Sequence, residues 1–164
     1  MKAHAPAEAD VAPTKPRLQY AALPFREGER LEIMLISSRE TRRWVVPKGW
    51  PIKGAKPHFV AASEAMEEAG LLGKISKKPI GAYHYVKRLR NGAGLLSEVR
   101  VFPFRVARQR KNWPERSQRT TKWFDAFEAA ELVHEPGLQG LIRGFAGVAA
   151  DEEEAEVTPD GVGR

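Results

Sequence analysis

The sequence predicts a single α/β domain in which strands and helices are mixed along the chain. The chain has 164 residues, of which 42% are hydrophobic, including four Trp and seven Phe. Such a length and composition suit one domain with a sizeable core. Several apolar runs have the length of β-strands, and two stretches have the spacing of amphipathic helices. The sequence has no Cys, which excludes a disulfide framework and thiolate chemistry.

The first half of the chain predicts a leader, a hairpin and a helix. Residues 1–16 are rich in Ala and Pro without periodicity, so we expect a disordered leader. The runs "LQYAALPF" and "LEIMLISS", joined by "REGER", predict a β-hairpin. "RRWVVPKGW" predicts a short strand that Pro47 and Gly49 stop. A helix is expected to begin at Pro57 and to end near Ala69, with Gly70 as its C-terminal stop.

The second half predicts three further strands, a short helical turn and a last helix. "IGAYHYVKR" and "EVRVFPFRVA" alternate as strands do, with an Asn-Gly turn between them. After the polar loop "RQRKNWPERSQRTTK", the segment "KWFDAFEAAEL" predicts a strand that enters a short helical turn. The last helix is expected over about residues 137–148, and residues 150–164 are expected to form an acidic disordered tail. The domain would thus cover residues 17–149, and the last helix carries a core-facing stripe of Leu138, Leu141, Ile142 and Phe145.

The charge distribution predicts a polyanionic partner. The net charge is +6, and because the last 14 residues hold six acids and one Arg, the preceding part carries +11. A basic body suits phosphate-rich small molecules or nucleic acid, although a merely solubilising surface also fits. No apolar run approaches the roughly 18 residues that a membrane span needs. The N-terminus has no hydrophobic segment of a secretory signal, so we expect a cytoplasmic protein without membrane contact.

The stretch "SEAMEEAGL" places Glu64, Glu67 and Glu68 on one arc of the predicted helix, about 100° wide. Repulsion among them costs only tenths of a kcal/mol for each pair. No Lys or Arg occurs between Pro57 and Gly73 to relieve the cluster. Grouped carboxylates suit Mg²⁺, so this chemistry leaves both a metal site and a solvated face open. The opposite side carries the residues that we expect to be buried: Phe59, Ala62, Met66 and Ala69.

The stretch "GWPIKGAKPHFVAASEAMEEAGL", from Gly49 to Leu71, resembles the Nudix box. Two positions depart from that pattern, because Ala55 stands for the first box Glu and Ser63 for the box Arg, two side chains that commonly interact in the family. "SSRETRRWVVPKG" and "WPERSQRTTKWF" resemble the diphosphoinositol and dinucleoside polyphosphate phosphohydrolase branch. The resemblance covers about residues 17–148, and the positions in register within the box are Gly49, Glu64, Glu67, Glu68, Gly70 and Leu71.

The resemblance implies a fold, an activity and a set of metal ligands. The fold is a Nudix-type α/β/α sandwich with a mixed β-sheet and a loop–helix–loop box, and the activity is Mg²⁺-dependent hydrolysis of a phosphoanhydride bond, with Mn²⁺ as a substitute. The expected metal ligands are the carboxylates of Glu64 and Glu68, together with Glu67 and the backbone carbonyl of Lys48. Glu67 is the expected general base, with Glu64 as the alternative.

Phosphate recognition requires cations around the carboxylates. We expect Trp50, in the box loop, to stack on a nucleobase, whereas Trp44 is expected in the core. Two interpretations of Glu115 are open. It is either a distal metal ligand or general base, or it is an ordinary loop residue. The cations expected to bind substrate are Arg39, Arg43, Lys48, Lys53 and Lys87.

Three functions remain in competition at the level of the sequence. The first is a pyrophosphohydrolase acting on a dinucleoside polyphosphate, a nucleoside diphosphate derivative or a diphosphoinositol polyphosphate. The second is a non-catalytic Nudix domain that binds a phosphorylated ligand, and the third is an RNA 5′-pyrophosphohydrolase. No RNA-binding signature accompanies the basic loop, so nucleic acid is not the expected partner. A monomer or a homodimer fits equally.

Overall fold

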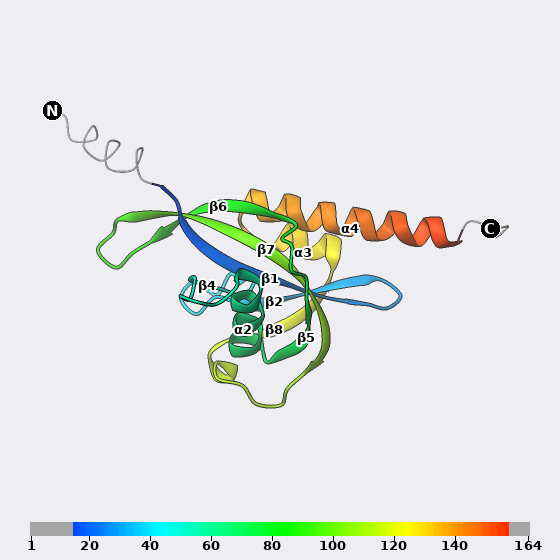
Figure 1. The fold of residues 1–164 in the computed structure, drawn as a ribbon, viewed down its shortest axis with the longest axis horizontal. Coiled ribbons are helices and arrows are strands. Elements are labelled where there is room, and N and C mark those ends of the chain that lie inside the picture. Colours follow the sequence, from blue (N-terminus) through cyan, green and yellow to red (C-terminus); the bar gives the residue numbers. More distant parts are fainter. Residues whose placement is uncertain (1–14, 158–164) are drawn as a thin grey trace.

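The protein, described here by a computed structural model over residues 15–157, is built around one mixed β-sheet with helices on both faces (Figure 1). Side chains are described as far as Ala149. Nearly all of the predicted leader, residues 1–16, lies outside the described residues. In chain order the elements are β1 (Arg17–Glu27), β2 (Leu31–Ser37), β3 (Trp44–Val45), β4 (Lys48–Gly49), α2 (Pro57–Ala69), β5 (Leu71–Ile75), β6 (Gly81–Arg88), β7 (Gly94–Gln109), a 3₁₀ turn (Arg116–Gln118), β8 (Thr121–Asp125), α3 (Ala126–Leu132) and α4 (Pro136–Val157).

The sheet is mixed because its two long central strands run parallel while their other neighbours run antiparallel. The path is β3-β2-β1-β7-β5, and β4, β6 and β8 pair with β1, β7 and β2 respectively. β1 and β7 align in parallel from Arg17 opposite Ser97 to Phe25 opposite Arg105. The two predicted hairpins, β1–β2 and β6–β7, are both present.

Alternation along β1 divides the core into two layers. Leu23 and Phe25 point into a cluster with α3 and α4, whereas Tyr20 and Ala22 point into a cluster with α2. Figure 1 shows the resulting order, with α2 on one face of the sheet and α3 and α4 on the other. This three-layer arrangement confirms the predicted α/β/α sandwich. None of the helices in residues 15–157 is long and apolar enough to cross a membrane.

Local signals predicted most element boundaries correctly. α2 begins at Pro57 and stops at Gly70, whose φ of 71° is left-handed. Trp44 packs on the core, with its ring 5.0 Å from that of Phe124, as predicted. The apolar stripe of α4 is also confirmed, since Leu138 and Ile142 are fully buried while Leu141 and Phe145 pack against the same cluster.

The structure differs from the expected elements in one added strand and in the length of the last helix. Strand β5 was not predicted; it pairs with the far end of β7. Helix α4 continues past the expected end at Val148 to Val157, because the sequence "DEEEAEV" lacks Pro and Gly and contains strong helix formers. Residues 150–157, which we assigned to a disordered tail, are therefore helical, and residues 158–164 lie outside the described part.

The buried face of α2 was predicted correctly at Ala69 but not at the other expected positions. Phe59 is 60% exposed, while Ala62 and Met66 are only partly buried. The sheet covers a face that is rotated from the expected one. The buried residues of α2 are Val60, Ala61, Ala65, Glu68 and Ala69.

Candidate active site

The acidic side chains of α2 are fixed in place by how the helix starts and stops. Pro57 occupies the first turn, where a missing N–H is harmless. The N–H of Gly70 donates to the carbonyl of Met66 at 2.8 Å and closes the last turn. A Cβ at Gly70 would overlap the Trp113 ring, so only glycine fits both the backbone and the packing.

Glu64 and Glu68 form a hydrogen-bonded pair of carboxyl groups beneath the box loop. The carboxylate of Glu64 lies against the backbone of Gly49, where any Cβ would overlap it. Glu68 is only 8% exposed. The pKa of Glu68 is raised to about 8, mainly by burial; the charge of Arg119 opposes this rise, and the hydrogen bond to Glu64 adds to it. Burial also raises the pKa of Glu64, while the interaction with Glu68 opposes that rise.

Glu67 does not join this pair. Its side chain is exposed, and its backbone carbonyl accepts a hydrogen bond of 3.1 Å from the N–H of Glu115. Across residues 15–157, no three His, Asp or Glu side chains are arranged so as to hold a metal ion. Of the expected triad, Glu68 is buried, Glu64 is partly buried beside it and Glu67 is exposed, and the role of the three as a metal site stays a prediction.

Arg119, which was not among the predicted site residues, lies against the Glu64–Glu68 pair. The side chain of Arg119 is 10% exposed, and its Nη2 atom lies 3.6 Å from Oε2 of Glu68. Its Nε donates to Oε1 of Glu115 at 2.7 Å, and its Nη1 donates to the carbonyl of Ser37 at 3.1 Å. The absence of a local counter-cation on α2 is thus offset by a residue from the loop before β8. Glu115 also belongs to the site, because its charge raises the pKa of both Glu64 and Glu68.

Lys48 pairs with Ala21, and its ammonium group lies over Tyr85, which packs against the core cluster of α3 and α4. Its Nζ lies 5.5 Å from the centre of the Tyr85 ring, and the Tyr85 hydroxyl donates to Oε1 of Gln19 at 2.7 Å. Burial lowers the pKa of Lys48, while the charges of Glu68 and Glu135 oppose that change. Lys87 is close enough for its charge to lower the pKa of Lys48 as well. Lys48 therefore lies within electrostatic range of Glu68, and Lys87 within range of Lys48.

The remaining predicted substrate residues lie at the surface. Arg39 donates to Oε1 of Gln118 at 2.9 Å, so it contacts the loop that carries Glu115. Arg43 and Lys53 are exposed on the loops before β3 and α2. Trp50 is 37% exposed, and the guanidinium of Arg17 lies 5.2 Å from its ring centre. Their contact with substrate stays a prediction.

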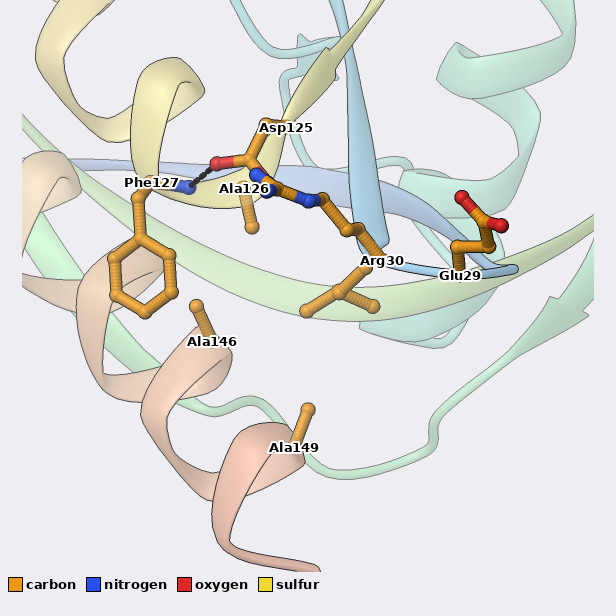
Figure 2. Close-up of a pocket in the computed structure, with 8 residues that line it drawn as sticks. Glu29, Arg30, Asp125, Ala126, Phe127, Ala146 and Ala149 are labelled. Carbon is orange, nitrogen blue, oxygen red and sulfur yellow. Dashed lines mark hydrogen bonds and ion pairs between the residues drawn. The ribbon is translucent and has the colours of Figure 1, made fainter. Parts of the chain in front are cut away.

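A pocket on the other face of the sheet contains none of the predicted site residues. It lies between the β1–β2 hairpin, the start of α3 and the helix α4, where Arg30 reaches toward Asp125 (Figure 2). Because α2 covers the opposite face, this pocket is separate from the acidic site. It is lined by Glu29, Arg30, Leu31, Asp125, Ala126, Phe127, Ala146 and Ala149.

A mixed sheet between helices, with an acidic helix entered from a glycine loop, defines a Nudix-type fold. Solved structures agree: a C. elegans Ap4A hydrolase binary complex superposes with a TM-score of 0.62 at 17% identity, covering 82% of this chain and 98% of that one. The NUDIX domain of Shewanella oneidensis NrtR, complexed with ADP ribose, gives a TM-score of 0.60 at 14% identity, covering 87% and 98%.

Sequence relatives point to the same superfamily. Nudix hydrolase 12, mitochondrial, of Arabidopsis thaliana is 28% identical over 130 residues, covering 75% of this chain and 62% of the relative. Nudix hydrolase 17, mitochondrial, of the same plant is 31% identical over 109 residues, covering 66% and 57%. Diphosphoinositol polyphosphate phosphohydrolase 3-alpha of Mus musculus is 28% identical over 121 residues, covering 71% and 70%. No family model matches the chain.

These similarities confirm the predicted resemblance to the Nudix hydrolases, including the diphosphoinositol polyphosphate branch. The chain spans about three fifths of the length of the Arabidopsis relatives Nudix hydrolase 12 and 13.

Proposed function

We propose that the protein is a Mg²⁺-dependent pyrophosphohydrolase that cleaves a phosphoanhydride bond by attack of water at phosphorus. The observation that carries this proposal is the Glu64–Glu68 pair. Glu68 is buried beside Glu64, with Arg119 as the cation in contact. Burying acids in this way destabilises a fold unless a charge partner compensates. A divalent cation bound by hard oxygen ligands supplies that compensation.

The donor atoms fit such a cation. Glu64 and Glu68 would hold it through their carboxylates, and the Lys48 carbonyl, next to Gly49, is the proposed backbone ligand. When bound, Mg²⁺ neutralises phosphate charge and polarises water, and Mn²⁺ would serve in its place. The proton of Glu68 must leave before the metal binds, so binding is expected to weaken toward low pH.

Two carboxylates remain candidates for the base that takes a proton from the attacking water. Glu67 is exposed and its charge reaches Glu64, so it is accessible to a water beside the metal. Glu115 lies on the loop that contacts the same turn of α2. Glu64, the sequence-based alternative, is less suited because its carboxylate is packed against Gly49 and paired with Glu68. We therefore propose Glu67 as the base.

The substrate class follows from the charge around the site. Lys48 and Lys87, with Arg39, Arg43 and Lys53 at the surface, would neutralise a chain of phosphates. Trp50 offers an aromatic surface that suits a nucleobase. We therefore propose a dinucleoside polyphosphate, a nucleoside diphosphate derivative or a diphosphoinositol polyphosphate as substrate. We also propose that the protein is cytoplasmic and is a monomer or a homodimer.

The test is a phosphate-release screen with and without Mg²⁺. Diadenosine tetraphosphate, ADP-ribose, nucleoside triphosphates, a diphosphoinositol polyphosphate and 5′-triphosphorylated RNA would be compared for the wild type, Glu64→Gln and Glu68→Gln. Glu131→Gln, an exposed acid on α3, is the matched control. Metal-dependent turnover that both box variants lose supports the proposal. Binding without turnover would instead establish the non-catalytic alternative, and release from RNA alone would establish the RNA alternative.

A further inference from the structure

The loop of residues 110–119, which we call the Trp113 loop, is seated on the last turn of α2. The N–H of Arg110 donates to the carbonyl of Gly70 at 2.8 Å, and the N–H of Glu115 donates to the carbonyl of Glu67 at 3.1 Å. The ring of Trp113 covers Gly70, where no side chain would fit. The loop thus contacts the same helical turn that carries the acidic residues.

Arg119 connects this loop to two other elements. Its guanidinium reaches Glu115 in the loop, the carbonyl of Ser37 at the end of β2, and Glu68 on α2. The side chain is 10% exposed, and that of Glu115 is 17% exposed, so water does not compete freely for these contacts. A planar guanidinium donates in several directions at once, which a Lys ammonium on a flexible stem does not reproduce.

We propose that Arg119 is a positioning residue that holds the Trp113 loop on α2 and thereby fixes Glu115 beside the Glu64–Glu68 pair. With Glu115 in place, one carboxylate from outside the box lies beside the Glu64–Glu68 pair. The chemical use of that carboxylate rests on the proposed hydrolase function, whereas its positioning by Arg119 does not. A buried ion pair that loses one partner leaves an uncompensated charge, so the loop should detach when Arg119 is replaced.

Amide hydrogen exchange of the metal-free protein tests the positioning directly. In Arg119→Met, exchange in the Trp113 loop should accelerate about ten-fold or more, as expected for the loss of a charged hydrogen bond. Arg119→Lys should restore the protection only in part. Glu115→Gln should resemble Arg119→Met, and the double variant should exceed neither, because both changes remove the same contact. Lys111→Met, which removes an exposed cation of the same loop, is the matched control and should leave the loop unchanged.

Two outcomes would overturn the inference. One is wild-type protection of the loop in Arg119→Met, and the other is equal acceleration throughout the protein, which indicates only a general loss of stability. Hydrolysis of diadenosine tetraphosphate with Mg²⁺ gives a second measurement. A positioning role predicts a lower kcat at unchanged KM, whereas a raised KM at unchanged kcat would mean direct substrate contact. A wild-type protein that hydrolyses nothing would contradict the proposed function, while the exchange measurement would still decide the role of Arg119.

Discussion

Replacing Glu68 by Gln should stabilise the metal-free protein at high pH. Burial raises the pKa of Glu68 from 4.5 to about 8 in the folded state. Between these two values the folded protein retains a proton that the unfolded chain releases. Stability therefore falls as the pH rises from about 4.5 to about 8, and it levels off above that range. Gln keeps the size of the neutral acid and removes the ionisation.

The magnitude follows from the difference between the two pKa values. A difference of one corresponds to 1.36 kcal/mol, so a rise from 4.5 to about 8 gives at most about 5 kcal/mol. Glu68 is coupled to Glu64 and lies beside Arg119, so we assign about 2 kcal/mol of this to the variant. Glu68→Gln should thus exceed the wild type by about 2 kcal/mol near pH 9 and differ little near pH 5.

The assay is urea unfolding with a chelator across this pH range, and Glu131→Gln serves as the control with no pH-dependent difference from the wild type. Added Mg²⁺ should reverse the order, because it stabilises the wild type by binding to the folded state alone. If Glu68→Gln were less stable than the wild type near pH 9, Arg119 would be holding an ionised Glu68 in place. The reasoning from burial would then be refuted.

Three further predictions follow from the same geometry. Gly49→Ala should displace the Glu64 carboxylate and lower Mg²⁺-dependent turnover about 100-fold, with circular dichroism close to that of the wild type; unaltered turnover would contradict the observed packing. Gly70→Ala should lower the free energy of unfolding by about 2–3 kcal/mol in urea, because the residue has φ of 71° and its Cβ would meet Trp113. Glu67→Gln should preserve that free energy and lower kcat about 100-fold or more, and a normal kcat would transfer the role of base to Glu115.

Local chemistry determined what the sequence could predict, and long-range contacts determined what it could not. Pro57 and Gly70 act through their own backbone, so the limits of α2 were predictable. Strand β5 depends on pairing with β7, which begins more than twenty residues later, and its run "LLGKI" has no alternation. Phe59 was misplaced because helical periodicity defines a face only in relation to the sheet that covers it.

Arg119 shows the same limit within the site. It was one of many cations in a basic sequence, and nothing in the spacing "WPERSQR" indicates that this Arg is the one that contacts Glu68. The Arg119–Glu115 pair has the i,i+4 spacing of a helix, yet only a 3₁₀ turn at Arg116–Gln118 lies between them. The conformation of the loop, rather than a helix, places Arg119 and Glu115 against α2.

The two departures from the Nudix box are compensated by the loop's own backbone. Ala55 and Ser63 replace two side chains that commonly interact in the family, so that contact is lost. Instead, the N–H of Ala55 donates to the carbonyl of Ile52 at 3.0 Å, and Gly54 adopts a φ of 83° that closes the turn. Ala55 also packs against the core cluster beneath α2, where a Glu would bury a charge. The box loop is thus fixed by a turn and apolar packing, which keeps Gly49 against Glu64 without an ion pair.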